Sequence, residues 1–253
     1  MAYECVEVET INSITTLRLN RPEALNAFNW TQQQDLIEAL HDAHEDDDVR
    51  VVILTGNGRA FSAGMDLKEG GKGWYKFRTD RKLMDIPTLL FKHIRKPIIA
   101  AINGPAIGWG LTLSLLCDIR VAAESARMSM RFTQIGLIPE AASPLLLPQI
   151  VGLANALDLS LTAKTIDAAE AYRIGLVNYL VPDNQLMDKT MEIAESIAEK
   201  SPTAIGFARR CFYDALELNF EQQQKKEKEE FVKCVTSGGF NKGQKKFLER
   251  KKD

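Results

Sequence analysis

The sequence between residues 51 and 68 reads VVILTGNGRAFSAGMDLK, an apolar run followed by a loop of small residues. The four apolar residues Val51 to Leu54 predict a strand that is covered on both faces, as in a parallel sheet. Two similar runs, Pro97–Ile102 and Ile119–Ala122, predict further strands, and Ile107–Leu116 between them has the composition of a buried helix. Because strands and helices alternate, we expect an α/β domain with a mostly parallel sheet.

The residues before this segment predict a hairpin and a helix. Tyr3–Val8 and Ile14–Leu19 are typical of short strands, with Asn12-Ser13 as the turn between them. Thr31–His44 has apolar residues at helical spacing, and Thr31 is the expected N-cap.

The segment after Pro139 predicts almost only helix. Asp167 begins a capping-box pattern, and Ser201-Pro202 is typical of a helix start. We divide the chain there into a core domain, residues 1–200, and a helical C-terminal region, residues 201–253. From Glu221 onward the chain is dense in charge, so we expect this region to pack on a neighbouring subunit.

Composition excludes several classes of function. The 253 residues carry a net charge of -2, so no bulk electrostatic argument favours nucleic acid. No apolar run approaches the roughly 18 residues of a membrane span, and the N-terminus lacks the pattern of a signal peptide. The four cysteines show no CxxC spacing, which favours reduced thiols in a cytoplasmic protein. His41 and His44 lie on a polar helix, where a solvated face is a better interpretation than a metal site.

Two more loops contain closely spaced small residues. NGPAIGWG at residues 103–110 leads from a predicted strand into a predicted helix, where the first N–H groups have no intrahelical partner and favour anions. GLIPEAASP at residues 136–144 is a turn with one carboxylate, Glu140. Each loop alone is a weak signal, because glycines after a strand usually mark a tight turn. The chain has no GxSxG elbow, dinucleotide fingerprint or Walker A lysine.

These three stretches, with LNRPEALNA at residues 19–27, resemble the enoyl-CoA hydratase/isomerase (crotonase) superfamily in order and spacing, from about Val6 to Lys251. The resemblance implies a spiral of β-β-α repeats whose C-terminal helices form a homotrimer, with two trimers commonly stacked as a hexamer. It also implies an acyl-CoA thioester as substrate. Coenzyme A is then part of the substrate, and no separate cofactor or metal is expected.

The resemblance also implies roles for individual residues. The backbone N–H groups of Met65 and Trp109 would form an oxyanion hole for a thioester enolate, where preorganised donors contribute roughly 3–4 kcal/mol each. Trp109 departs from the glycine that is frequent in the family, so its indole either shapes the acyl pocket or packs in the core. The implied CoA-binding residues are Ala24, Leu25, Ser62, Ala63, Gly64, Asp66 and Lys68, and the expected acyl pocket includes Trp74, Leu113 and Phe132.

The reaction is predicted from a departure from the family pattern. Hydratases of the family use two glutamates, and this chain has Thr112 and Phe132 at those positions, neither of which is a general base at neutral pH. Glu140 is similar in position to the single catalytic glutamate of Δ3,Δ2-enoyl-CoA isomerases, and related bacterial enoyl-CoA hydratases share its turn. We therefore expect isomerisation with Glu140 as the proton-shuttling base. The alternatives are hydration by Glu140 with a bound water, and a non-catalytic homologue that binds acyl-CoA or a protein.

Overall fold

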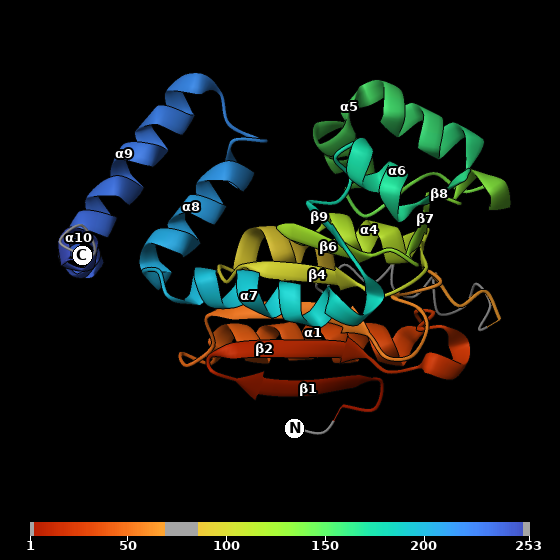
Figure 1. Cartoon of the computed structure of the whole chain (residues 1–253). Coiled ribbons are helices and arrows are strands. Elements are labelled where there is room, and N and C mark those ends of the chain that lie inside the picture. The colour runs from red at the N-terminus through yellow and green to blue at the C-terminus, as the bar shows by residue number, and fades with distance from the viewer. Residues whose placement is uncertain (1–2, 69–85, 250–253) are drawn as a thin grey trace.

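The computed structural model describes residues 3–68 and 86–249, and a six-stranded sheet runs through its centre (Figure 1). β1 and β2 are antiparallel, and all other neighbours in this sheet are parallel, so the predicted α/β class is confirmed. The strands, in spatial order, are β1 (Val6–Ile11), β2 (Ile14–Leu19), β3 (Val51–Gly56), β4 (Ile98–Ile102), β6 (Ile119–Ala123) and β9 (Tyr179–Val181).

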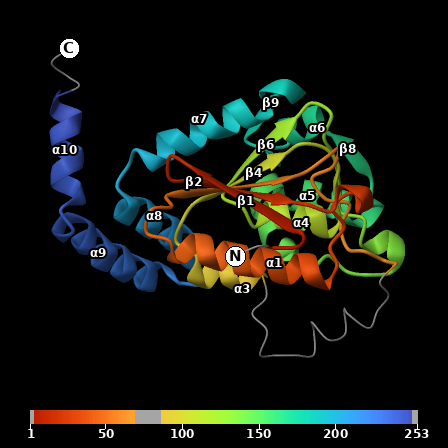
Figure 2. The ribbon, with the colours of Figure 1, turned by 90° about the horizontal axis from the view of Figure 1, so that it is seen from below.

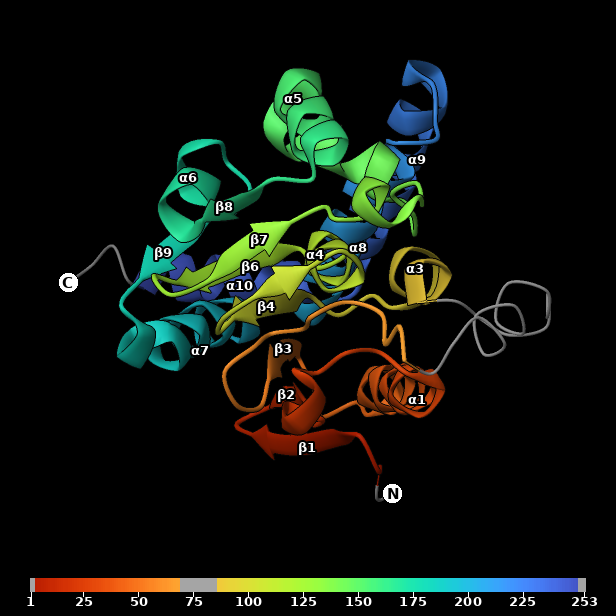
Figure 3. The ribbon, with the colours of Figure 1, turned by 90° about the vertical axis from the view of Figure 1, so that its right-hand side faces the viewer.

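The central strands are apolar throughout because both of their faces are covered. Alternate residues of a strand point to opposite faces, so Val51 and Ile53 belong to one apolar cluster and Val52 and Leu54 to another. The first cluster is closed by α7 (Leu186–Ala198), and the larger second cluster includes residues of α1 (Trp30–Glu45). Figure 3 shows α7 on one side of the sheet and α1 and α4 on the other.

A second, smaller sheet lies beside the first. β5 (Ala106–Ile107) pairs in parallel with β7 (Arg127–Ser129), which pairs in antiparallel fashion with β8 (Thr165–Asp167). The segment after Pro139 is mostly helical, as predicted, but the prediction missed the two short strands β8 and β9. Strands of three residues are too short to show a period in the sequence.

Some predicted boundaries were also wrong. β1 starts at Val6 rather than Tyr3 and extends to Ile11, because the tight turn lets Ile11 pair with Ile14. The N-cap of α1 is Asn29 rather than Thr31, and its side chain accepts from the N–H of Gln32. The buried helix α4 (Trp109–Leu115) starts two residues late, because Ala106-Ile107 pairs with β7.

The helical C-terminal region is confirmed. It consists of α8 (Pro202–Asp214), α9 (Phe220–Thr236) and α10 (Gly239–Glu249), and Ser201 caps α8 as predicted. Figures 1 and 2 show α9 and α10 at one side of the molecule, away from the sheets. The remaining elements are α3 (Ile86–Thr88), α5 (Ser143–Thr162), α6 (Ala168–Arg173), the π-helical turn η2 (Leu89–His93), and the 3-10 turns η1 (Pro22–Ala24), η3 (Thr133–Ile135) and η4 (Asp183–Gln185).

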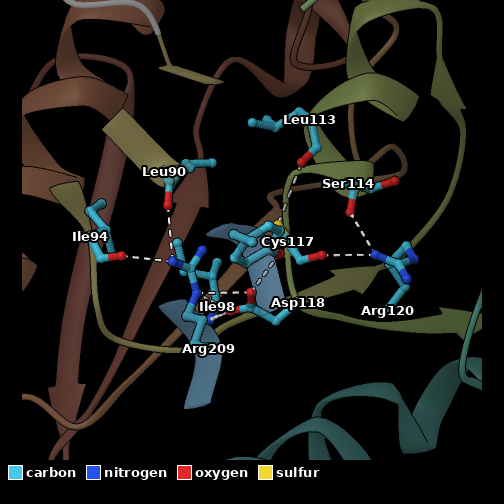
Figure 4. A network of polar contacts seen from close by, with 10 residues as sticks. Leu90, Ile94, Ile98, Leu113, Ser114, Cys117, Asp118, Arg120 and Arg209 are labelled. Atoms are coloured by element: carbon cyan, nitrogen blue, oxygen red, sulfur yellow. Dashed lines mark hydrogen bonds and ion pairs between the residues drawn. The ribbon is translucent and has the colours of Figure 1, made fainter. Parts of the chain in front are cut away.

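A largely buried ion pair fixes α8 to the core (Figure 4). Arg209 of α8 donates to Asp118 at 2.8 Å and to the carbonyls of Leu90 and Ile94 at 3.0 and 2.7 Å. Asp118 also accepts from the N–H of Ile98 at 2.7 Å, so one carboxylate joins α8 to β4. Breaking a buried pair of this kind typically costs about 3–5 kcal/mol. Burial raises the pKa of the neighbouring Cys117 thiol to about 12, so it stays protonated.

α5 is long and apolar enough to cross a membrane, with a mean hydropathy of 1.4, although core helices of soluble proteins can pass the same test. Gly152 has non-helical angles (φ 79, ψ 155) and divides the helix in two. Leu146 and Leu147 pack in the larger core cluster, whereas Leu153 and Leu157 are exposed. α5 therefore has one face that packs in the core and one apolar face that is exposed in the described part of the chain.

Candidate active site

Two of the glycine-containing loops meet beyond the sheet. They follow β3 and β4, which are neighbouring parallel strands, so both leave from the same edge of the sheet. A parallel bridge between Ser62 and Ala106 joins them. In this bridge the N–H of Ser62 donates to Pro105 O at 3.0 Å, and the N–H of Ile107 donates to Ser62 O at 3.0 Å. The structure thus brings together loops that lie more than 40 residues apart in the sequence.

Gly64 is required for this close approach. A Cβ at this position would lie 2.6 Å from Ile107 O and 3.5 Å from the backbone nitrogen of Trp109, and the φ of Gly64 is +95. Covalent geometry places the nitrogen of Met65 about 3 Å from the same Cβ position, so the nitrogens of Met65 and Trp109 lie within roughly 7 Å of each other.

Both of these amides are available as donors. Phe28 and Met65 form a parallel bridge, in which the N–H of Phe28 donates to Gly64 O at 2.7 Å and the N–H of Asp66 donates to Phe28 O at 2.9 Å. In this pattern the N–H of Met65 points away from Phe28. Trp109 is the first residue of α4, so its N–H has no intrahelical acceptor. Within residues 3–68 and 86–249, neither N–H donates to another group. The two predicted oxyanion donors therefore lie close together with free N–H groups.

The side chains assigned to the acyl pocket lie in the larger core cluster. Trp109 is 4% exposed, and its ring packs edge-on against Phe28 with centroids 6.1 Å apart. Leu113 and Phe132 belong to the same cluster, whereas Trp74 lies outside the described residues. The indole N–H of Trp109 and the hydroxyl of Thr112 are enclosed and have no hydrogen-bond partner among the described residues. The apolar wall beside the two amides is thus tightly packed.

Asn26 connects the loops of the site, although the sequence pattern assigns it no separate role. Asn26 is fully buried, and its Nδ2 donates to the carbonyls of Asn57 and Ala60 at 2.9 and 2.8 Å. Its Oδ1 accepts from the N–H of Arg21 at 2.9 Å. The only sequence signal is its place at the end of the predicted CoA-binding stretch, since all of these partners are set by the fold.

The residues predicted to bind CoA gather around the same loops. The N–H of Ala63 donates to Leu25 O at 2.9 Å, which places the two stretches side by side. Ser62 is buried, and its hydroxyl donates to Asn26 O at 2.7 Å. Asp66 forms an ion pair with Arg21 at 3.1 Å, while Lys68 is exposed. Ser62 and Asp66 therefore hold the loops in place, and the assignment of this group to CoA stays a prediction.

Glu140 lies in the tight turn that precedes α5 and is half-buried. Its carbonyl accepts from the N–H of Ser143 at 3.0 Å, which closes the turn. The two residues inside the turn, Ala141 and Ala142, have φ values of 52 and 61 and pack against the core cluster that contains Trp109. The turn that carries the carboxylate thus rests on the same cluster as the side chain of Trp109.

The comparison with protein families agrees with this geometry. Residues 9–253 match a family model described as enoyl-CoA hydratase/isomerase. The chain belongs to this family. A probable enoyl-CoA hydratase of Mycobacterium bovis is 38% identical over 88% of this chain and 83% of the relative. Another of Rhodobacter capsulatus is 33% identical over 99% of this chain and 97% of the relative.

Solved structures of the family superpose closely on the chain. An enoyl-CoA hydratase from Bacillus anthracis gives a TM-score of 0.90 at 33% identity and covers 98% of this chain and 97% of its own. A monofunctional enoyl CoA isomerase from M. smegmatis gives 0.75 at 34% identity, with 87% and 98% coverage. The crotonase-type fold is therefore confirmed, and the chain is an enzyme of the enoyl-CoA hydratase/isomerase family with an enoyl-CoA thioester as the substrate that this family implies.

The family's chemistry agrees with the groups found at the site. Backbone amides with no acceptor among the described residues are a suitable type of group to stabilise negative charge on a thioester oxygen, and a carboxylate is a suitable type of group for proton transfer. Among residues 3–68 and 86–249, no group of three His, Cys, Asp or Glu side chains lies close enough to hold a metal ion.

Proposed function

We propose that this enzyme shifts the double bond of a 3-enoyl-CoA to the 2-position, with Glu140 as the only base. Glu140 removes a proton from C2, and the electron pair moves into the thioester carbonyl to give a dienolate. The N–H groups of Met65 and Trp109 stabilise the resulting oxyanion. The protonated Glu140 then returns the proton to C4, and the double bond forms between C2 and C3.

One observation carries this proposal: the positions at which the family's hydratases have glutamates hold buried groups that are not bases. Thr112 is fully buried, and Phe132 is 4% exposed in the larger core cluster. Isomerisation needs only one carboxylate, because the acid that forms in the first step returns the proton in the second. An apolar setting also makes a carboxylate a stronger base for the first step, because it raises the pKa of the carboxyl group.

A direct comparison of two substrates tests this proposal. The purified enzyme is assayed with a 3-enoyl-CoA, following formation of the conjugated thioester, and with a 2-enoyl-CoA in water, following loss of conjugation. We expect kcat/KM for isomerisation to exceed that for hydration by about 100-fold or more, the usual contribution of a positioned acid–base group. Faster hydration than isomerisation would contradict it.

Hydration is a second candidate, supported by a specific observation. The relatives above from M. bovis and R. capsulatus are both named as probable hydratases. The hydroxyl of Thr112 is buried without a hydrogen-bond partner among the described residues, one turn from the amide of Trp109. A movement that opens this position would let Thr112 hold a water for Glu140. A third candidate, a homologue that binds acyl-CoA without turnover, predicts no product in either assay.

The proposal includes a homotrimer, or a hexamer of two trimers, in the cytoplasm. Leu153, Leu157 and Leu161 form an exposed row along α5, and Phe231 and Val232 are exposed on α9. Apolar faces of this kind usually mark protein interfaces. The four cysteines are free, as expected for a reducing compartment. Light scattering on the purified chain distinguishes trimer and hexamer from monomer.

A further inference from the structure

Three tight turns in the chain share one unusual backbone conformation. Their two central residues are Asn12-Ser13 (φ 51 and 67), Leu25-Asn26 (φ 52 and 54) and Ala141-Ala142 (φ 52 and 61). These are type I′ turns, which favour Asn, Asp and Gly because a Cβ disfavours positive φ. The first lies in the β1–β2 hairpin, and the other two lie at the candidate active site.

The turn after Glu140 has a sequence that does not favour its conformation. Alanine has no polar side-chain group that could stabilise a positive φ, and here two alanines follow one another. Ala142 is also the N-cap of α5, where its side chain makes no capping hydrogen bond. An asparagine would suit both the turn and the cap. The local sequence therefore does not explain the conformation.

Packing explains it instead. Ala141 and Ala142 are half-buried, and both pack against the cluster that contains Trp109 and Phe132. Glu140 is the first residue of the turn, and its carbonyl accepts the closing hydrogen bond from Ser143 at 3.0 Å. A change of turn type would rotate the backbone at the end of Glu140 and swing its side chain away.

We propose that Ala141 and Ala142 are positioning residues, whose methyl groups seat a type I′ turn on the core and thereby hold the Glu140 carboxylate toward the amides of Met65 and Trp109. This inference rests on the proposed role of Glu140 as the base. Backbone conformations that the local sequence disfavours persist where the surrounding structure imposes them, often at active sites.

Replacement of both alanines by glycine tests the proposal in the full-length enzyme. Ala141→Gly with Ala142→Gly removes the methyl groups that contact the core, and because glycine adopts negative φ as readily as positive φ, the turn is then no longer held in one conformation. Because a misplacement of about 1 Å can cost 10²-fold in rate, we expect kcat with a 3-enoyl-CoA to fall by about 10-fold to 100-fold. KM should change less than about threefold, since the residues predicted to bind CoA lie in other loops. A purely structural role would lower stability and leave kcat unchanged, which would overturn the proposal.

A second variant restores the turn by another route. Ala141→Asn with Ala142→Gly supplies the sequence that type I′ turns prefer, so we expect most of the lost kcat to return. Failure to recover would show that the turn conformation is not what matters and would also overturn the proposal. The matched control is Ala163→Gly, because Ala163 has φ 51 at the far end of α5. Its kcat should equal that of the unmodified enzyme.

Glu140→Gln in the same assays separates this inference from the proposed function. If Glu140→Gln keeps its turnover, Glu140 is not the base, and both ideas fail. If Glu140→Gln loses turnover while the double glycine variant keeps it, the proposed function stands and only the positioning role fails.

Discussion

The turn of the β1–β2 hairpin and the turn after Glu140 have the same backbone shape for different reasons. In the hairpin, Asn12 tolerates positive φ, and the pairing of Ile11 with Ile14 continues directly from the turn. After Glu140, two alanines adopt that shape while packing on the core. Local sequence is thus sufficient in the scaffold, whereas the rest of the protein imposes the backbone at the candidate site. That difference is expected where geometry serves chemistry.

Glu140→Gln should have the largest effect. If it has no consequence, the proposed difference between the hairpin turn and the turn after Glu140 is wrong. The amide keeps the shape of the side chain and cannot accept the C2 proton. We expect kcat to fall by about 10²–10⁴-fold, as measured by conversion of a 3-enoyl-CoA. The thermal unfolding midpoint should stay close to that of the unmodified chain. Near-normal turnover would show that the turn serves only the fold.

Gly64→Ala should have the next largest effect, because it disturbs the backbone that holds the two amides close together. The new Cβ would meet Ile107 O at 2.6 Å, so one loop must move. Loss of one aligned donor typically costs about 10²-fold in kcat, and kcat/KM with a 3-enoyl-CoA should fall by at least this much.

Gly238→Ala is the matched control for Gly64→Ala. Gly238 also has positive φ (+76), but a Cβ added there would have no neighbouring atom within 4 Å among the described residues, so only the backbone strain is shared. Gly238 lies far from Met65 and Trp109 in the sequence and belongs to no strand or loop of the candidate site. We therefore expect kcat/KM of this variant to stay within about twofold of that of the unmodified enzyme. Equal losses in both variants would contradict a specific role for Gly64.

Leu25→Gly and Asn12→Gly form a matched pair with smaller effects. Each replaces the first central residue of a type I′ turn, and glycine suits that position in both turns. Leu25 is half-buried beside Ala63 in the predicted CoA-binding loops, so loss of its side chain should raise KM about fivefold to tenfold. Asn12→Gly should leave KM and kcat unchanged. Steady-state kinetics with one enoyl-CoA measures both, and an equal KM in the two variants would contradict CoA contact at Leu25.

The sequence predicted those parts of the fold that depend on local patterns. The apolar run Val51 to Leu54 forms β3, the hairpin turn lies at Asn12-Ser13, and Asp167 and Ser201 cap helices as expected. The short strands β8 and β9 were missed, because three residues show no period. Positive φ at two alanines had no local signal, since alanine normally avoids it.

The predicted site residues came from a family resemblance, and the contacts that assemble them are non-local. The hydrogen bonds of Asn26 reach Asn57 and Ala60, which lie 31 and 34 residues away. The bridge between Ser62 and Ala106 spans a still longer stretch. Such contacts depend on the order of strands in the sheet, which no single stretch of sequence encodes.

We propose that two backbone amides and one carboxylate act on a single thioester. A crystal structure of the enzyme with an unreactive analogue of a 3-enoyl-CoA tests it most directly. We expect the thioester oxygen to lie about 2.7–3.1 Å from the nitrogens of both Met65 and Trp109, with the Glu140 carboxylate beside C2. A thioester oxygen bound by other groups, or a Glu140 side chain turned away from C2, would contradict the account.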